Sequence, residues 1–342
     1  MTHLTRAHTE LFKRTEDERF DSLAAVYDHC RQEQQDSQDR WHHPQLFEPQ
    51  VDGDSVRLRL GHDGAFALNH WSFSQLCGLS GVSKDTLNKL SPETASQALR
   101  ETLPSGSKPL QVLTTGEQVR SIHGTQYSRL WNADLLSMLR EFATDFQPPP
   151  KGFNGATGLY CGQQDLFCFL IDPAGWTEIG GQNFAPGFFV WNSEVGRRSL
   201  GIETFWFQAV CQNHIVWDAV EVVEFSRKHT GNVAASLEDI RRIITDLVAK
   251  RDARKDGFAK LIEKAMTERV GQDGEEATKF LFKHGIPRHL VKEAVTKIAE
   301  RGERFTLWSL IDALTSLTGQ VRYAGDRTEL DIKVAQLLAL AV

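Results

Sequence analysis

The stretch GFFVWNSEVGRRSL, residues 187–200, decides the fold of the region around it. Aromatic and β-branched residues fill its first part, and another apolar run follows its last residue, so both sides of the turn favour strands. The polar residues between them fit a short turn, and the whole predicts a β-hairpin. We expect the hairpin to hide its apolar faces and to present four polar side chains together at one end: Asn192, Glu194, Arg197 and Arg198.

β-prone segments and short helices surround this hairpin. Further β segments are expected at residues 51–60, 110–113, 118–123 and 155–171, from alternation or from apolar runs between turns. A helix is expected at 132–142, with Asn132 as its cap. From Ser236 onward, helical periodicity and dense charge continue to the end of the chain. These patterns predict an α+β fold, with a mixed, mostly antiparallel β core and a helical C-terminal third.

Three regions follow from these patterns. We expect an N-terminal arm at 1–45, an α+β core at 46–230 and a helical C-terminal region at 231–342. The arm shows a helical period followed by a Gln-rich polar stretch, and we interpret it as an interaction arm or a frayed helix. The residues that carry this period are Phe20, Leu23, Ala24 and Tyr27.

Composition and charge limit the class of protein. The chain has 342 residues, of which 40% are hydrophobic and 25% are charged, as in an ordinary globular protein. Its net charge is −6, which counts against coating DNA by charge alone, so nucleic-acid binding would need a local basic patch or an oligomeric groove. No apolar signal core or membrane span is evident, and we expect a cytoplasmic protein without a membrane partner.

The cysteines and the missing motifs narrow the chemistry. Five cysteines, an odd count with no Cys-x-x-Cys pair, indicate a reducing compartment and argue against a zinc knuckle. No phosphate-binding loop and no His-Glu-x-x-His motif occurs. We therefore predict no cofactor, no metal site and no catalytic residue. Cys211 fits a buried core thiol better than a nucleophile, and whether Glu194 or Cys211 has a chemical role stays open.

Arginines and aromatic residues are the strongest binding candidates. If arginines from separate β segments converge on one groove, they make a phosphate track, on which exposed aromatic rings can stack bases. The alternative is that these arginines solvate the surface and the aromatic residues fill the core. The predicted nucleic-acid-binding residues are Arg120, Tyr127, Arg129, Trp131, Asn192, Arg197 and Arg198.

Three segments carry a resemblance to a known family. They are VRSIHGTQYSRLWNADLL at 119–136, NSEVGRRSL with the later CQN within 192–213, and TLWSLIDALT at 306–315. In these segments the chain resembles the phage/plasmid-like protein family (domain of unknown function 932), found mainly on prophages, plasmids and other mobile elements. The resemblance implies a role in recombination or repair, in plasmid maintenance or in phage defence, and it brings no catalytic residues.

These observations favour a mobile-element-associated protein that binds nucleic acid. Single-stranded DNA is the expected partner, in recombination or repair, and a homo-oligomer is the expected assembly, similar in outline to phage single-strand annealing proteins. Two alternatives stay open. One is a protein-interaction adaptor in phage or plasmid defence or counter-defence. The other is a nuclease or hydrolase that uses Glu194 with His123 or His214, although we lean away from an enzyme.

Overall fold

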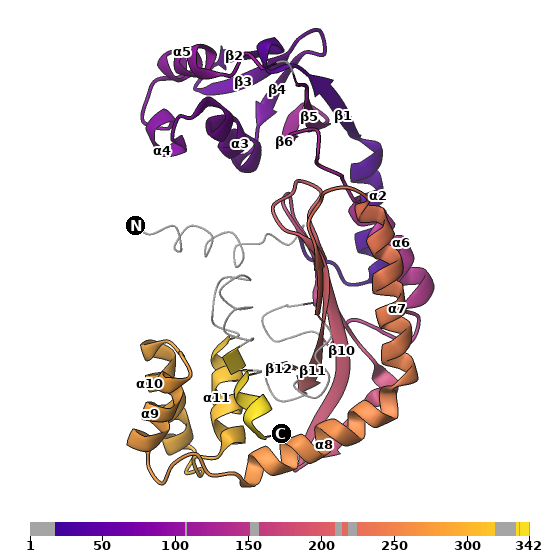
Figure 1. Cartoon of the computed structure of the whole chain (residues 1–342), viewed down its shortest axis with the longest axis vertical. Helices are drawn as coiled ribbons and strands as arrows, with labels where there is room; N and C mark the ends of the chain where they lie inside the picture. Colours follow the sequence, from indigo (N-terminus) through magenta and orange to yellow (C-terminus); the bar gives the residue numbers. More distant parts are fainter. Residues whose placement is uncertain are drawn as a thin grey trace.

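The computed structural model describes residues 18–106, 108–150, 157–208, 214–217, 224–318, 333–334 and 336–341. It confirms the α+β class, with two β-sheets and a helical C-terminal part. Figure 1 shows that the chain curves, with one sheet at one end, the long strands of the other sheet in the middle, and the last helices at the opposite end. None of the described helices is long and apolar enough to cross a membrane.

A six-stranded sheet forms one end of the molecule. Its order is β1-β5-β6-β4-β3-β2; the β4–β6 pair is parallel and the other neighbouring pairs are antiparallel. The strands are β1 (Ser37–His42), β2 (Phe47–Asp52), β3 (Ser55–Leu60), β4 (Ala65–Leu68), β5 (Leu110–Thr115) and β6 (Gln118–His123).

Three helices pack on one face of this sheet: α3 (His70–Ser80), α4 (Lys84–Leu87) and α5 (Pro92–Thr102). Their starts are fixed by side chains that accept hydrogen bonds from backbone N–H groups of the first turn, from the caps Asn69, Ser83 and Ser91. The opposite face of β5 and β6 carries polar and charged residues, and it is this face that meets the candidate site.

A seven-stranded antiparallel sheet forms the middle of the molecule. Its order is β12-β11-β10-β8-β7, with β13 on β11 and β9 on β10. The predicted hairpin is confirmed as its centre, since β10 and β11 pair from Phe184 with Gln208 to Trp191 with Gly201. The strands are β7 (Leu159–Cys161), β8 (Leu166–Ile171), β9 (Thr177–Ile179), β10 (Gln182–Asn192), β11 (Leu200–Gln208), β12 (His214–Trp217) and β13 (Glu224–Arg227).

Both faces of this sheet are apolar. Side chains that alternate along β10 and β11 enter two different clusters, so Phe188 lies in one cluster and Phe189 in the other. On the first face pack α2 (Leu23–Gln35), α6 (Asn132–Phe142) and α7 (Ser236–Ala249), which Figure 1 shows along the outer side of the curve. Burial on both faces explains why the hairpin segments are continuously apolar.

The last helices close the other end of the sheet. They are α8 (Arg251–Thr267), α9 (Gly274–Lys283), α10 (Arg288–Glu300) and α11 (Leu307–Thr318). Their core includes Phe184 and Trp206 from the hairpin, and the Trp206 ring stacks on Phe258 with centroids 4.0 Å apart. This stacking stabilises the packing of the C-terminal helices on the sheet, because an aromatic pair contributes more free energy than the burial of its surface alone.

Two expectations about local structure change. The N-terminal arm is not separate from the core: Val26 and Cys30 of α2 are fully buried, and β1 pairs with β5. The helix at 132–142 is confirmed, but Asn132 does not cap it. Trp131 occupies the cap position, where its indole has no acceptor for a backbone N–H, and the Asn132 side chain accepts a hydrogen bond from Asn192.

Candidate functional site

The turn at residues 193–198, between β10 and β11, is the centre of the site. Its backbone carbonyl groups accept hydrogen bonds from side chains of the six-stranded sheet and of the elements beside it. Trp71 Nε1 donates to Val195 O (2.8 Å), His123 Nε2 bonds the same oxygen (3.0 Å), and Tyr127 Oη donates to Glu194 O (2.8 Å). The turn therefore joins the two sheets, and we call it the junction turn.

Glycine is required at one position of the junction turn. Gly196 has φ +68°, and a Cβ atom there would lie 2.7 Å from His123 Cε1 and 2.9 Å from Tyr127 Cε2. These two rings stack on each other, with centroids 3.7 Å apart and planes 7° apart. The turn thus lies directly against the ring pair, at a distance that only glycine permits.

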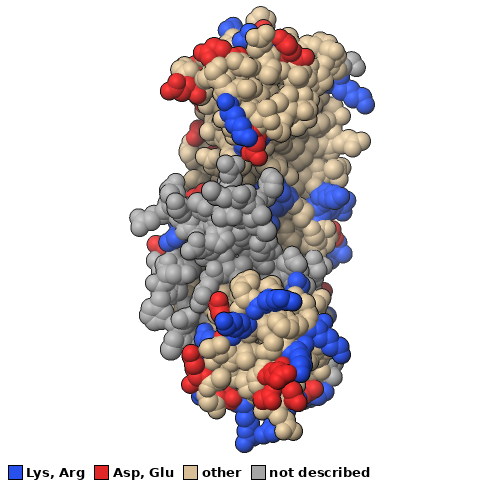
Figure 2. Space-filling model, turned by 90° about the vertical axis from the view of Figure 1, so that its left-hand side faces the viewer, with Lys and Arg blue, Asp and Glu red and all other residues tan. Residues whose placement is uncertain are grey.

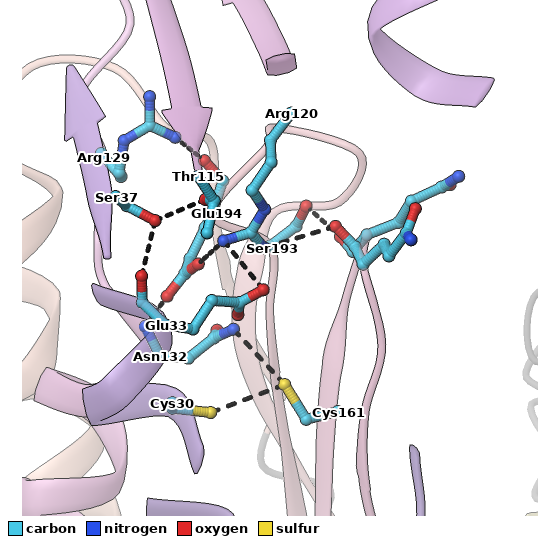
Figure 3. A network of polar contacts seen from close by, with 12 residues as sticks. Cys30, Glu33, Ser37, Thr115, Arg120, Arg129, Asn132, Cys161, Ser193 and Glu194 are labelled. Carbon is cyan, nitrogen blue, oxygen red and sulfur yellow. Dashed lines mark hydrogen bonds and ion pairs between the residues drawn. The ribbon is translucent and has the colours of Figure 1, made fainter. Parts of the chain in front are cut away.

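A buried ion network lies beneath the turn. Arg120 from β6 is 3% exposed and Glu194 from the turn is 1% exposed. Arg120 Nη1 lies 3.0 Å from Glu194 Oε2 and 3.2 Å from Glu33 Oε1 of α2, as Figure 3 shows. The other oxygen of Glu194 accepts a hydrogen bond from the backbone N–H of Asn132 (2.8 Å). Charged groups this deep in a protein are stable only when they are paired in this way.

The two carboxylates share a single guanidinium. Burial raises the pKa of Glu194 above its usual value, although the Arg120 charge acts in the opposite direction. Burial likewise raises the pKa of Glu33, against the same arginine. One positive charge therefore does not fully compensate the carboxylates of the buried Glu194 and the partly buried Glu33.

A second arginine holds the turn from the outside. Arg129 Nη2 lies 2.7 Å from Asp39 Oδ1 of β1, and Arg129 Nη1 donates to Glu194 O. Its guanidinium also lies over the rings of Tyr127 and Trp131, 5.3 Å and 5.4 Å from their centroids. Arg129 is thus held by a carboxylate, a carbonyl and two aromatic faces.

Asn192 and Ser193 anchor the start of the turn. Asn192 is fully buried, and its Nδ2 donates to Leu130 O (2.9 Å) and to Asn132 Oδ1 (2.8 Å). Ser193 Oγ donates to Gln164 O and accepts from the Arg197 N–H (2.9 Å). These bonds fix the conformation of the chain just before the exposed part of the turn.

The last residues of the turn face solvent. Arg197 is exposed, and its guanidinium lies 5.1 Å from the ring centroid of Trp71. Arg198 is partly exposed; its Nε lies 3.3 Å from Asp165 Oδ2, and its guanidinium lies over the Phe167 ring. No carboxylate within the described part of the chain forms an ion pair with Arg197.

All seven predicted binding residues therefore lie at or around the junction turn, but they point in different directions. Arg120 and Asn192 are buried, and Arg129, Tyr127 and Trp131 are at least partly covered within the junction. The expectation that Asn192 and Glu194 are presented at the hairpin end is wrong, because both point into the interior. Only Arg197 and Arg198 carry their charge toward solvent.

Sequence reasoning missed several residues of the junction: His29, Glu33, Asp39, Trp41, Cys161, Arg227 and Lys228. The four-residue spacing of His29 and Glu33 places both on one helix face, and this was the one signal available for them. The others lie in strands whose neighbours are distant in sequence, or directly after such a strand in the case of Lys228, so that nothing in the local pattern marks them.

In the hydrolase alternative Glu194 acts with His123, but these two side chains do not form a hydrogen bond with each other. The Glu194 carboxylate bonds Arg120 and the Asn132 N–H, whereas the His123 ring bonds Val195 O and stacks on Tyr127. Burial lowers the pKa of His123 to about 4, and the Arg129 charge acts in the same direction. Cys211 and the side chain of His214 lie outside the described residues.

Comparison with protein families gives one match. Residues 119–322, more than half of the chain, match the family described as a domain of unknown function (DUF932). The match begins in β6, one residue before Arg120, and includes the junction turn. No curated protein and no solved structure matches the chain.

Proposed function

Because the chain belongs to the DUF932 family, whose description assigns no activity, we propose a function from the junction itself: the protein binds single-stranded nucleic acid, and DNA is the expected form. The observation that carries this proposal is a set of exposed cations beside the junction turn. We call Arg197, Arg198, Arg227 and Lys228 the basic end of the hairpin.

Strand pairing brings these cations together. Arg227 of β13 is the register partner of Leu200 at the start of β11, and Ser226 Oγ lies 2.7 Å from Ser199 Oγ. Arg227 and Lys228 therefore lie next to the end of the junction turn, and both are exposed. Within the described residues, neither forms an ion pair with a carboxylate. The charges of Arg197, Arg227 and Lys228 are thus available to phosphate groups, whereas Arg198 is paired with Asp165.

The wider surface is compatible with this site. Figure 2 shows Lys and Arg side chains at mid-height of one face, beside the grey segments, whereas most Asp and Glu side chains of that face lie toward its two ends. The net charge of −6 is therefore distributed unevenly. A local basic region on an acidic protein can bind a polyanion at low salt.

Aromatic rings beside the basic end favour single strands over duplex. Trp41 of β1 is 49% exposed, and it is on the same strand face as Asp39, which bonds Arg129. Trp71 is partly exposed beneath Arg197. Unpaired bases stack on such rings, and each stacked base contributes about 1–3 kcal/mol.

The buried network supports binding indirectly. Arg120, Glu194 and Asn192 fix the base of the junction turn. The backbone that carries the exposed arginines is therefore already ordered before nucleic acid binds. A rigid turn loses less conformational entropy when it binds, which increases affinity. In this proposal the predicted residues divide into an inner group that positions the turn and an outer group that contacts phosphate.

Binding is tested by fluorescence anisotropy of a labelled oligothymidine at about 50 mM salt. We expect the triple variant Arg197→Ala, Arg227→Ala, Lys228→Ala to bind at least about tenfold more weakly than the wild type. A control variant with the same charge change is Arg242→Ala, Lys279→Ala, Lys292→Ala, whose substitutions lie on exposed positions of α7, α9 and α10. It should retain most of the affinity.

Two results would reject the proposal. One is no binding of the wild type at low salt, and the other is an equal loss of affinity in both triple variants. Comparison with oligouridine and with duplex DNA decides the nucleic-acid type. A particle-size measurement with and without the oligonucleotide tests the homo-oligomer that we propose, and failure to assemble would leave the binding site itself unaffected.

We also propose a reducing, cytoplasmic location and a role in mobile-element recombination or repair. Four buried cysteines are free thiols: Cys30, Cys77, Cys161 and Cys168. The sulfur atoms of Cys30 and Cys161 lie 3.5 Å apart without a bond between them. Unlinked thiols at this distance are typical of a compartment that keeps cysteine reduced.

A further inference from the structure

Three potential metal ligands meet behind the buried ion network. His29 and Glu33 lie one turn apart on α2, and Cys161 ends β7. One ligand atom from each side chain lies within 4.8 Å of the others. Imidazole, carboxylate and thiolate are the three donor types that bind zinc in proteins.

A second thiol is adjacent. Cys30 Sγ lies 3.5 Å from Cys161 Sγ, and Figure 3 shows the two sulfur atoms facing each other. At this distance the Cys30 thiol can donate a hydrogen bond to a Cys161 thiolate, and such a bond stabilises the charged form that zinc requires.

The charges of the network point to a missing cation. Two carboxylates, the buried Glu194 and the partly buried Glu33, face one guanidinium, Arg120, which leaves a net charge of one minus two, or −1. Arg129 does not correct this balance, because it is paired with Asp39. Glu33 Oε2 is buried and has no hydrogen-bond partner. A buried carboxylate oxygen without a partner is costly unless another group binds it.

We propose that His29, Glu33 and Cys161 bind a zinc ion, with the fourth position open to solvent and Cys30 beside the site as a neutral thiol. Glu33 would use its unpartnered Oε2 for the metal and keep Oε1 for Arg120. Binding converts the Cys161 thiol to a thiolate and releases its proton to solvent, so the ion and this thiolate together add one positive charge. That charge cancels the −1 of the carboxylate–guanidinium cluster.

The surroundings fit such a site. Asn132 Nδ2 lies 3.9 Å from Cys161 Sγ, where it can donate a hydrogen bond to a thiolate. His29 is on the exposed side of α2, so the ion has a route from solvent, and the Phe20 ring lies 5.0 Å from the imidazole. Groups that orient ligands in this way are a regular part of metal sites.

A bound zinc ion would link α2 to the region that matches the DUF932 family, residues 119–322. Cys161 lies within the matched region, whereas His29, Cys30 and Glu33 precede it. Because Glu33 and Glu194 share Arg120, the ion would also act on the junction turn through this arginine. The sequence alone gives no metal site, since Cys161 lies far along the chain from His29 and Glu33 and no short motif joins the three ligands.

The test uses the full chain, kept reduced with a phosphine and freed of metal by a chelator. Titration with Zn²⁺, followed by mass spectrometry of the metal content, should give one ion per chain. Co²⁺ in its place should show the near-ultraviolet band of thiolate-to-metal charge transfer and the visible bands of tetrahedral coordination. His29→Ala and Cys161→Ser should each weaken zinc affinity by about tenfold or more.

Two control variants keep the experiment decisive. Cys77→Ser removes a buried thiol in the core of the six-stranded sheet, and His62→Gln removes an exposed imidazole in a turn. Both should bind zinc like the wild type. If Cys161→Ser fails to fold, His29→Ala still tests the site, because the His29 side chain is exposed. No stoichiometric zinc in the wild type, a Co²⁺ complex without the thiolate band, or unchanged affinity in His29→Ala would overturn the proposal.

Discussion

Arg120 and Glu194 form an ion pair of 3.0 Å although 74 residues separate them in the sequence. Arg120 belongs to the six-stranded sheet and Glu194 to the turn that ends the central hairpin of the other sheet. Both side chains are almost fully buried. This pair therefore joins the two sheets at the place where exposed cations gather.

The first prediction concerns the stability of this junction. Glu194→Ala leaves Arg120 with Glu33 as its remaining carboxylate in a buried site, and we expect the free energy of unfolding to fall by about 3–5 kcal/mol. Urea denaturation measures this change. Glu117→Ala is the control, because Glu117 is 90% exposed and pairs with Arg57 at the surface. Its loss should cost less than about 1 kcal/mol. Equal effects of the two substitutions would show that the buried pair has no special role.

The second prediction concerns Gly196. An alanine there is strained by the positive φ and meets both rings of the His123–Tyr127 pair, so we expect a loss of about 2–4 kcal/mol in unfolding free energy. Gly116→Ala separates the two effects, since Gly116 has φ +52° and nothing lies within 4 Å of its added Cβ. That variant should lose only about 1 kcal/mol. A Gly196→Ala protein as stable as Gly116→Ala would contradict the close contact.

The third prediction is a pH dependence. The pKa of His123 is about 4 in the folded protein, below the usual 6.5, so the unfolded chain binds a proton first as the pH falls. The contribution of neutral His123 to stability is complete above about pH 6.5 and is lost as the pH falls toward 4. His123→Gln can still donate to Val195 O but does not titrate.

Urea denaturation at two pH values measures this effect. Between about pH 7.5 and pH 5, the wild type should lose roughly 2 kcal/mol more stability than His123→Gln. His62→Gln, a substitution in an exposed turn, should follow the wild type. The same pH dependence in all three proteins would exclude His123 as its source.

The fourth prediction concerns Trp41. This ring is half exposed on β1, and its replacement by alanine should leave the unfolding free energy within about 0.5 kcal/mol of the wild type. If bases stack on the ring, the same change should weaken oligothymidine binding by about 1–3 kcal/mol. Leu46→Ala, at another exposed apolar position, should change neither quantity. A Trp41→Ala protein with full affinity would remove this ring from the binding surface.

The sequence predicted the secondary structure well where the pattern is local. The hairpin at 187–200 and the helix at 132–142 follow from apolar runs, turn residues and helical periodicity, which depend only on near neighbours. The α+β class with a mostly antiparallel β core was predicted from the same signals. The arm before residue 45 was harder, because the burial of Val26 and the pairing of β1 with β5 depend on partners far along the chain.

The sequence could not predict whether the side chains of the site residues point to solvent or into the interior. In β6 the side chains of the segment VRSI do not alternate regularly, because the register with β5 shifts between Leu113 and Thr114 and leaves Arg120 as the extra residue of a β-bulge. An arginine in such a strand looks exposed from sequence, and its burial depends on two carboxylates, one 74 residues later in the chain. The sequence therefore left open whether these residues gather at the turn and which of them reach solvent.

The salt dependence of oligothymidine binding tests the central claim most directly. Each phosphate contact adds about 0.7 to the slope of log affinity against log salt for a single strand, so removing Arg197, Arg227 and Lys228 should lower that slope by roughly 2. The triple variant on α7, α9 and α10 should keep the wild-type slope. A wild-type protein whose binding is independent of salt, or a basic-end variant with an unchanged slope, would contradict the claim that these cations contact nucleic acid.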